Sequence, residues 1–264
     1  MTQDSTSKSS NRSINPRTNL QGQVICITGA GRGLGRALAE AFAKQGASLV
    51  LGARTASEID ALAAQLGDGP NGVPVIALQT NVQNVGEIRN LVTAAVGEFG
   101  KIDVMINNAG VAHYGPIEDV NEAQFDEMMA TNVKGTYFGS QAALNAMKPQ
   151  RSGLIVNVSS IAGKLHLPGE SAYNASKWAV NGFTGTLRLE AQKYGVRVTC
   201  LCPGGIHTPF WRHQETVPYP TDLIEPERDF MDPNEVANSV VEIAMTSERY
   251  VVPEIVMMPV LTQL

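Results

Sequence analysis

The sequence has few cysteines, no long apolar segment and no excess of positive charge. No run of about 18 apolar residues is present, so the sequence predicts no membrane-spanning helix. The three cysteines, Cys26, Cys200 and Cys202, lie in apolar stretches that predict strands, and their spacing matches no metal-binding pattern. We therefore expect buried, unreactive thiols in a reducing compartment and no metal site.

Basic residues are outnumbered, with 20 Lys and Arg against 25 Asp and Glu, which gives a formal net charge of −5 at pH 7. Proteins that bind nucleic acids usually have a basic face, so we expect no nucleic-acid partner. The hydrophobic share of 43% and the charged share of 17% are those of an ordinary globular protein. A chain of 264 residues can bury a sizeable core without disulfides or metal ions.

The first 20 residues are polar and rich in Ser and Asn, and they lack the apolar centre of a secretion signal. We expect a disordered tail over residues 1–20 and a cytoplasmic protein. A cleaved organelle-targeting segment is the alternative, because the same residues include Ser and Arg and little acid.

From residue 21 onward, short β-rich runs alternate with longer amphipathic segments. The predicted strands span residues 23–29, 48–54, 73–82, 101–110, 153–160, 196–205 and 254–260. The predicted helices span residues 34–46, 57–67, 85–100, 122–147, 172–195 and 233–247. Gly46 is expected to end the first helix, Ser57 to cap the second, and Pro149 to end the fourth.

This alternation predicts an α/β fold, in which right-handed crossovers join parallel strands into a Rossmann-type doubly wound sheet with helices on both faces. No linker divides residues 21–264, so we expect a single domain. The segment 209–232 interrupts the alternation and predicts a long loop with short helical pieces, which is usually a functional feature. Its aromatic residues predict an apolar cover over a substrate site: Phe210, Trp211, Tyr219 and Phe230.

A glycine-rich turn, TGAGRGLG, follows the first predicted strand at residues 28–35. Gly29, Gly33 and Gly35 let backbone N–H groups approach a pyrophosphate closely, and the next helix directs its positive end toward that group. A tight strand-to-helix bend without a ligand is the alternative. The position after the first strand and before a helix favours dinucleotide binding.

The end of the second predicted strand bears on which dinucleotide is bound. An NAD site usually has an acidic residue there for the ribose 2′-hydroxyl. Here the residues are Leu51, Gly52, Ala53 and Arg54. Arg54, with Arg32 from the glycine-rich turn, can hold a 2′-phosphate through planar guanidinium groups. The alternative is two solvated surface arginines; we expect NADP(H).

Tyr173 and Lys177 form a YxxxK pattern in a predicted helix, where residues four apart share a face. A nearby ammonium should lower the pKa of the phenol and suit Tyr173 to acid–base catalysis. Ser160 ends the preceding predicted strand, in position to donate a hydrogen bond to a substrate oxygen. Ser159 is the rival, but neighbouring side chains of a strand face opposite ways. A half-buried aromatic is the alternative for Tyr173.

Further polar residues lie in the predicted loops at the same edge of the sheet. In NNAG, residues 107–110, backbone groups of Asn107 and Gly110 can lie near the adenosine half of the cofactor, or simply form a turn. His113, His166 and His207 lack the paired spacing of metal ligands. Residues expected to shape substrate choice are His113, Tyr114, His166, Leu167 and Trp211, and an ordinary surface-loop histidine is the alternative for His166.

In combination and in this order, these motifs resemble the short-chain dehydrogenase/reductase family over about residues 20–260. The resemblance rests on TGAGRGLG, NNAG, Asn132 in TNVKG, Ser160, YNASK and PGGIHT. It implies a seven-stranded parallel sheet and a homodimer or homotetramer. It also implies that Ser160 orients a carbonyl, that Tyr173 is the acid–base group, that Lys177 binds the nicotinamide ribose, and that Asn132 supports a water-linked proton path.

The residues that the motifs and the resemblance assign to the cofactor are Gly29, Arg32, Gly33, Leu34, Gly35, Arg54, Asn81, Val82, Asn108, Ala109, Gly110, Tyr173, Lys177, Pro203, Gly204, Ile206 and Thr208. Two departures from the family pattern stand out. Asn81 replaces a frequent Asp that meets the adenine, and the chain ends in EIVMMPVLTQL rather than a glycine-rich segment.

The sequence thus predicts an NADP(H)-dependent enzyme that reduces a small carbonyl compound to an alcohol, or catalyses the reverse. A 3-ketoacyl-acyl-carrier-protein reductase is the first alternative, which the unusual C-terminus makes less favoured. A regulatory protein that binds NADP without turnover is the second alternative. The intact set of Asn132, Ser160, Tyr173 and Lys177 argues against it.

Overall fold

The structure is a computed structural model that describes residues 15–68, 71–214 and 216–260. Most of the predicted N-terminal tail lies outside these ranges. Leu20 is buried and Arg17 forms an ion pair of 2.7 Å with Glu248, so the packed region begins before residue 21. Within the described residues, no helix is long and apolar enough to cross a membrane.

Parallel strands form one seven-stranded sheet in the order β3-β2-β1-β4-β5-β6-β7. This order confirms the predicted doubly wound sheet. The strands are β1 (Val24–Thr28), β2 (Ser48–Ala53), β3 (Val75–Gln79), β4 (Val104–Asn107), β5 (Leu154–Val158), β6 (Arg197–Pro203) and β7 (Glu254–Met257). The three central strands β1, β4 and β5 are buried along their whole length, as a sheet covered on both faces requires.

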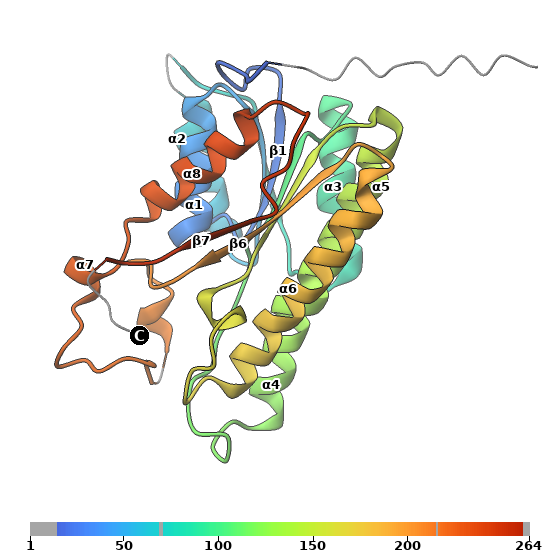
Figure 1. The fold of residues 1–264 in the computed structure, drawn as a ribbon. Helices are drawn as coiled ribbons and strands as arrows, with labels where there is room; N and C mark the ends of the chain where they lie inside the picture. The colour runs from blue at the N-terminus through green and yellow to red at the C-terminus, as the bar shows by residue number, and fades with distance from the viewer. Residues whose placement is uncertain (1–14, 69–70, 215, 261–264) are drawn as a thin grey trace, which may run out of the picture.

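Helices cover both faces of the sheet (Figure 1). They are α1 (Gly33–Lys44), α2 (Ala56–Gly67), α3 (Val85–Phe99), α4 (Glu122–Met128), α5 (Thr136–Gln150), α6 (Ser171–Gln192), α7 (Pro226–Asp229) and α8 (Pro233–Met245). One apolar core lies between the sheet and α1, α2 and α8, and a second lies between the sheet and α3, α5 and α6. Cys26, Cys200 and Cys202 are buried free thiols, as predicted.

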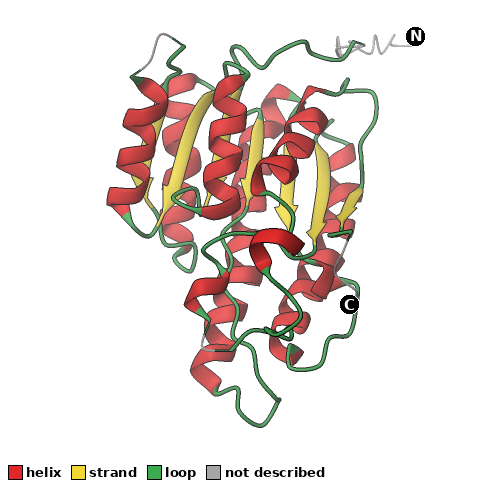
Figure 2. Ribbon diagram, turned by 90° about the vertical axis from the view of Figure 1, so that its left-hand side faces the viewer, coloured by secondary structure: helices red, strands yellow, loops and turns green. Residues whose placement is uncertain are grey.

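The strands point toward the end of the sheet where loops and short helices gather (Figure 2). After β1, the chain places β2 and β3 on one side of it. The later strands, β4 to β7, follow on the other side, so the strand order reverses between β1 and β4. Ligands of doubly wound sheets bind in the crevice at this reversal. Two short 3₁₀ helices, η2 (Ile161–Gly163) and η3 (Trp211–His213), also lie at this end, and η3 with α7 supplies the helical pieces predicted in residues 209–232.

Three details of the helices differ from prediction. The region predicted as one helix over 122–147 contains a π-helical segment, η1 (Met129–Gly135), between α4 and α5. Pro149 does not end α5: the helix runs one residue further, to Gln150, and ends where Arg151 takes a left-handed φ of 52°. Ser57 is not a cap.

Helix α2 begins one residue before Ser57, and Thr55 is its N-cap without a side-chain hydrogen bond. The packing of Ile59 and Leu62 in the core determines the position of this helix. Gly46 has a φ of 81° directly after the end of α1, as a helix-terminating glycine should.

A buried polar network ties the two central strands to the helices above them. The amide of Asn107 donates to Asn157 Oδ1 at 2.8 Å, and Ser140 Oγ donates to the same oxygen at 3.0 Å. The Asn157 amide then donates to Thr184 Oγ1 at 3.0 Å. These bonds join β4, β5, α5 and α6, and therefore hold in register the strand ends that precede the site.

We expect Asn157→Ala to lower the free energy of unfolding by at least about 2 kcal/mol, since it leaves several buried polar groups unpaired. Urea denaturation followed by circular dichroism measures the change. The exposed Asn145→Ala on α5 is the control, with an expected change within about 0.5 kcal/mol. Equal midpoints for the two variants would show that the network contributes little.

Candidate active site

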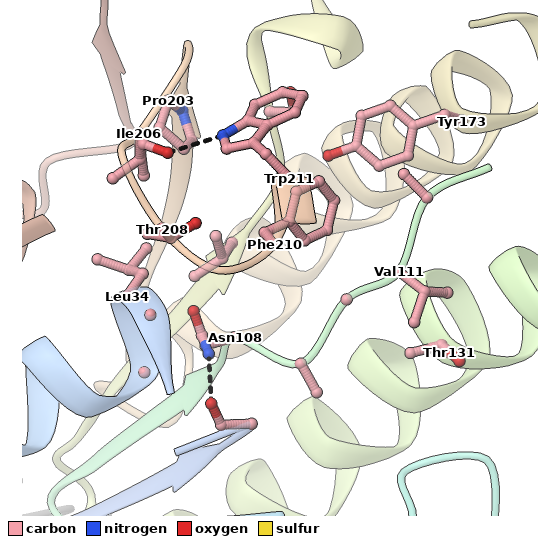
Figure 3. A pocket seen from close by; sticks show the side chains of 18 of the residues that line it. Leu34, Asn108, Val111, Thr131, Tyr173, Pro203, Ile206, Thr208, Phe210 and Trp211 are labelled. Carbon is pink, nitrogen blue, oxygen red and sulfur yellow. Dashed lines mark hydrogen bonds between the residues drawn. The ribbon is translucent and has the colours of Figure 1, made fainter. Parts of the chain in front are cut away.

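A cavity of about 460 Å³ opens at the carboxyl ends of the strands and runs from the glycine-rich turn to the 209–232 loop (Figure 3). This volume lies in the range of ordinary ligand sites. Every residue assigned from the sequence to the cofactor, together with Ser160, lines it. Of the other residues with a predicted role at the site, Asn107, Asn132 and His166 do not line it.

The glycine-rich turn leaves room where side chains would otherwise fill it. Gly29 has a φ of 65°, and a Cβ there would lie 2.9 Å from Ala109 Cα. A Cβ on Gly35 would collide with the Gly29 carbonyl oxygen. Asn108 Nδ2 donates to the carbonyls of Thr28 and Gly29 at 3.0 and 3.1 Å (Figure 3). This bare backbone at the start of α1 fits a dinucleotide pyrophosphate.

Charged side chains lie at the β2 end of the cavity. Arg32 and Arg54 both line it, and Arg54 Nη1 lies 3.5 Å from Glu127 Oε1. Glu58, in the first turn of α2, also lines the cavity and packs against Gly31, where a Cβ would lie 2.6 Å from its Oε2. The sequence analysis considered only the residues that end the strand and therefore missed this carboxylate.

At the opposite end, Tyr173 of α6 directs its hydroxyl into the cavity (Figure 3). The side chains of Tyr173 and Ser160 are hydrogen-bonded to each other. Lys177 Nζ lies 5.5 Å from the centre of the Tyr173 ring and donates to the Val158 carbonyl at 3.1 Å. Ser159 Oγ instead donates to the Lys177 carbonyl at 3.1 Å, so Ser160 is the serine beside the tyrosine.

The electrostatics of this group differ from the sequence expectation. Burial raises the pKa of Tyr173, and the hydrogen bond with Ser160 offsets only part of that rise. Lys177 was expected to lower the pKa of Tyr173 below its usual range, but desolvation dominates. Burial also lowers the pKa of Lys177 to about 8, because the ammonium loses water contacts.

Asn132 lies in the π-helical segment η1 and is buried. Its Nδ2 donates to the Val111 carbonyl at 2.9 Å and to Ser176 Oγ at 3.0 Å, while its Oδ1 accepts from Val111 N at 2.9 Å. These bonds fix the chain that follows NNAG beside α6. A role in a water-linked proton path stays a prediction.

The predicted substrate residues divide into two groups. His113, Tyr114, Leu167 and Trp211 line the cavity. His166 does not line it, because its ring stacks on the partly exposed Trp178 with centroids 5.5 Å apart. Spacing between Ser160 and Tyr173 could not reveal this, since the side chain turns toward α6.

The loop aromatics form a wall opposite Tyr173. Trp211 Nε1 donates to the Ile206 carbonyl at 2.8 Å (Figure 3). The Trp211 ring is stacked near Tyr114 with centroids 6.1 Å apart and tilted against Phe230 at 5.2 Å. The predicted apolar cover is therefore present and packed against the cavity.

Glu170 is a site residue that the sequence analysis did not identify. It is the residue before α6, its side chain lines the cavity, and burial raises its pKa to about 7. Its position three residues before Tyr173 was the available signal. Of the described residues, no group of three His, Cys, Asp or Glu side chains is arranged to hold a metal ion.

The sequence matches the short chain dehydrogenase family over residues 23–217. It is 34% identical to a sepiapterin reductase of Chlorobaculum tepidum, over 89% of this chain and 96% of that protein. A 3-oxoacyl-acyl-carrier-protein reductase of Vibrio cholerae is 32% identical, over 89% of this chain and 95% of that protein.

A similar solved structure is that of an alcohol dehydrogenase from the archaeon Thermococcus sibiricus complexed with 5-hydroxy-NADP. It superposes with a TM-score of 0.83 at 27% identity, over 92% of this chain and 98% of that one. Because the family match extends over more than half of the sequence, the chain belongs to the short-chain dehydrogenase/reductase family of oxidoreductases, whose members use NAD(P).

Proposed function

We propose that this protein is an NADP(H)-dependent oxidoreductase that reduces a ketone or aldehyde to an alcohol, or catalyses the reverse. One observation carries the proposal. One end of the cavity holds the phenol of Tyr173, the hydroxyl of Ser160 and the ammonium of Lys177. Its other end is formed by the exposed backbone of the glycine-rich turn.

The nicotinamide of the bound cofactor would supply the hydride. As negative charge develops on the carbonyl oxygen, Ser160 donates a hydrogen bond to it and Tyr173 transfers its proton. A phenol is protonated at neutral pH even at its ordinary pKa, and burial raises the pKa of Tyr173 further, so this residue holds the proton that it transfers. Lys177 then stabilises the phenolate that remains, which its charge can do only while the amine is protonated.

The preference for NADP(H) rests on Arg32 and Arg54, which line the cavity at the β2 end. Planar guanidinium groups bind phosphate oxygens in pairs. The similar alcohol dehydrogenase was crystallised with 5-hydroxy-NADP, which supports the same preference here. Asn81 lines the cavity beside these residues, and its Oδ1 accepts from Gln83 N at 3.1 Å.

A small carbonyl substrate is favoured over an acyl-carrier-protein thioester. An acidic carrier would be steered by a basic rim, but the substrate end of this cavity holds the carboxyl group of Glu170. A regulatory protein that binds NADP without turnover would not need Tyr173 and Lys177 in this arrangement. Composition and resemblance support, as further proposals, a cytoplasmic location and a homodimer or homotetramer.

Tyr173→Phe should lower kcat for ketone reduction by about 10²- to 10⁴-fold, because it removes the proton donor. NADPH consumption, followed at 340 nm, measures the loss over a panel of aldehydes and ketones. Tyr137→Phe, an exposed tyrosine on α5, is the matched control and should leave kcat unchanged. A Tyr173→Phe enzyme that keeps more than a tenth of its kcat would reject this acid.

Arg54→Ala should raise the Kd for NADPH about tenfold to a hundredfold and leave the Kd for NADH almost unchanged, since only NADPH has the 2′-phosphate. Isothermal titration measures both constants. Arg36→Ala, an arginine paired with Glu40 on the outer face of α1, is the control. Wild-type protein that binds NADH as tightly as NADPH would contradict the preference itself.

The rate of reduction should fall as the pH rises through about 8, where the buried Lys177 loses its proton. The direction follows from the lowered pKa: the cation is present below this value and absent above it. A profile of kcat/KM against pH from 6 to 10 tests this. Lys177→Arg keeps the charge and should remove the break, whereas a flat wild-type profile to pH 10 would contradict the role.

A further inference from the structure

A carboxyl group without a protein partner lies at the substrate end of the cavity. Glu170 is 6% exposed, and its side chain lines the cavity beside Tyr114 and Tyr173. Among the described residues, no ion pair or side-chain hydrogen bond reaches its carboxyl oxygens. Its backbone is occupied, because the carbonyl accepts from Asn174 N at 2.7 Å.

The other charged side chains of the cavity either have protein partners or lie away from Glu170. Glu127 is paired with His113 Nε2 at 2.8 Å and with Arg54. Glu58 lies at the opposite end, against Gly31. Lys177 donates to a backbone carbonyl. Burial is the cause of the raised pKa of Glu170.

Aromatic rings surround this end of the cavity. Tyr114, Trp211 and Phe210 line it together with Tyr219 and Phe230, and they contact one another at centroid distances of 5.2–6.1 Å. The faces of aromatic rings attract cations, most strongly when water is excluded. A buried carboxylate is costly until a cation pairs with it. Together these features are complementary to one positive charge.

We propose that the substrate is a carbonyl compound that also carries a protonated amine, which Glu170 binds while the carbonyl lies at Tyr173 and Ser160. This proposal rests on the reductase function proposed above. Glu170 precedes Tyr173 by about one helical turn, roughly 5 Å along the axis, so one small molecule can reach both residues. Glu170 is therefore a specificity-determining residue.

Three ketones of one scaffold test the charge preference. They are 4′-(aminomethyl)acetophenone, a cation at neutral pH, the neutral 4′-methylacetophenone, and the anionic 4-acetylbenzoate. With NADPH, the wild-type kcat/KM should be about tenfold to a hundredfold higher for the cation than for the neutral ketone, and lowest for the anion. Glu170→Gln should abolish the advantage of the cation, so that the ratio of kcat/KM for the cation to kcat/KM for the neutral ketone falls to about one.

Glu190→Gln, an exposed glutamate on the same helix, is the matched control and should keep the wild-type preference. A cation-to-neutral ratio that is the same in wild type and Glu170→Gln overturns the proposal. So does a wild-type preference for the anion, a result that needs no variant and holds even if Glu170→Gln is unstable.

Binding separates this proposal from the proposed function. Isothermal titration of 4′-(aminomethyl)acetophenone into the protein, with and without NADPH, measures affinity independently of turnover. Affinity that falls tenfold in Glu170→Gln supports the cation site even if no ketone is reduced, and in that case only the reductase function fails. Affinity equal in both proteins overturns the cation site, whatever the activity.

Discussion

The close approach of the two chain segments that follow β1 and β4 is the constraint on which the site depends. Gly29 and Ala109 are so near that no side chain fits between them. Asn108 fixes this distance by donating to the Thr28 and Gly29 carbonyls. The sheet reverses its order at this point, and the crevice that opens there continues to the ends of β5 and β6. Every other feature of the site is positioned relative to this contact.

Burial sets the chemistry at the far end of the crevice. Three ionisable groups, Tyr173, Lys177 and Glu170, lie close together with little access to water. In each, burial shifts the pKa in the direction that favours the uncharged form: upward for Tyr173 and Glu170, and downward for Lys177. In a surface cluster, water would screen these groups and leave their pKa values near normal. Here burial keeps the Tyr173 phenol protonated well above neutral pH and brings the ammonium of Lys177 close to its titration range, so release of the phenol proton depends on the positive charge of Lys177 beside it.

The 209–232 loop supplies the walls that make this burial possible. Trp211 is anchored by its indole hydrogen bond to the Ile206 carbonyl and by contacts with Tyr114 and Phe230. Ile206 in turn lies in the segment after β6 that lines the cofactor end. The same loop thus contacts both halves of the cavity.

The sequence by itself determined the alternation of strands and helices, the doubly wound sheet and many of the residues that line the cavity at its reversal. These features follow from local periodicity, from glycines that only a close backbone approach explains, and from motifs at the ends of strands. The choice of Ser160 over Ser159 also followed from local geometry, because successive side chains of a strand face opposite ways.

Only the tertiary structure decided how these residues are surrounded. It kept Pro149 inside a helix, turned His166 away onto Trp178, gave Asn132 three hydrogen bonds, and raised rather than lowered the pKa of Tyr173. It also brought Glu170 into an aromatic pocket without a partner. Burial and partner choice depend on residues far apart in the chain, and a local pattern carries no information about them.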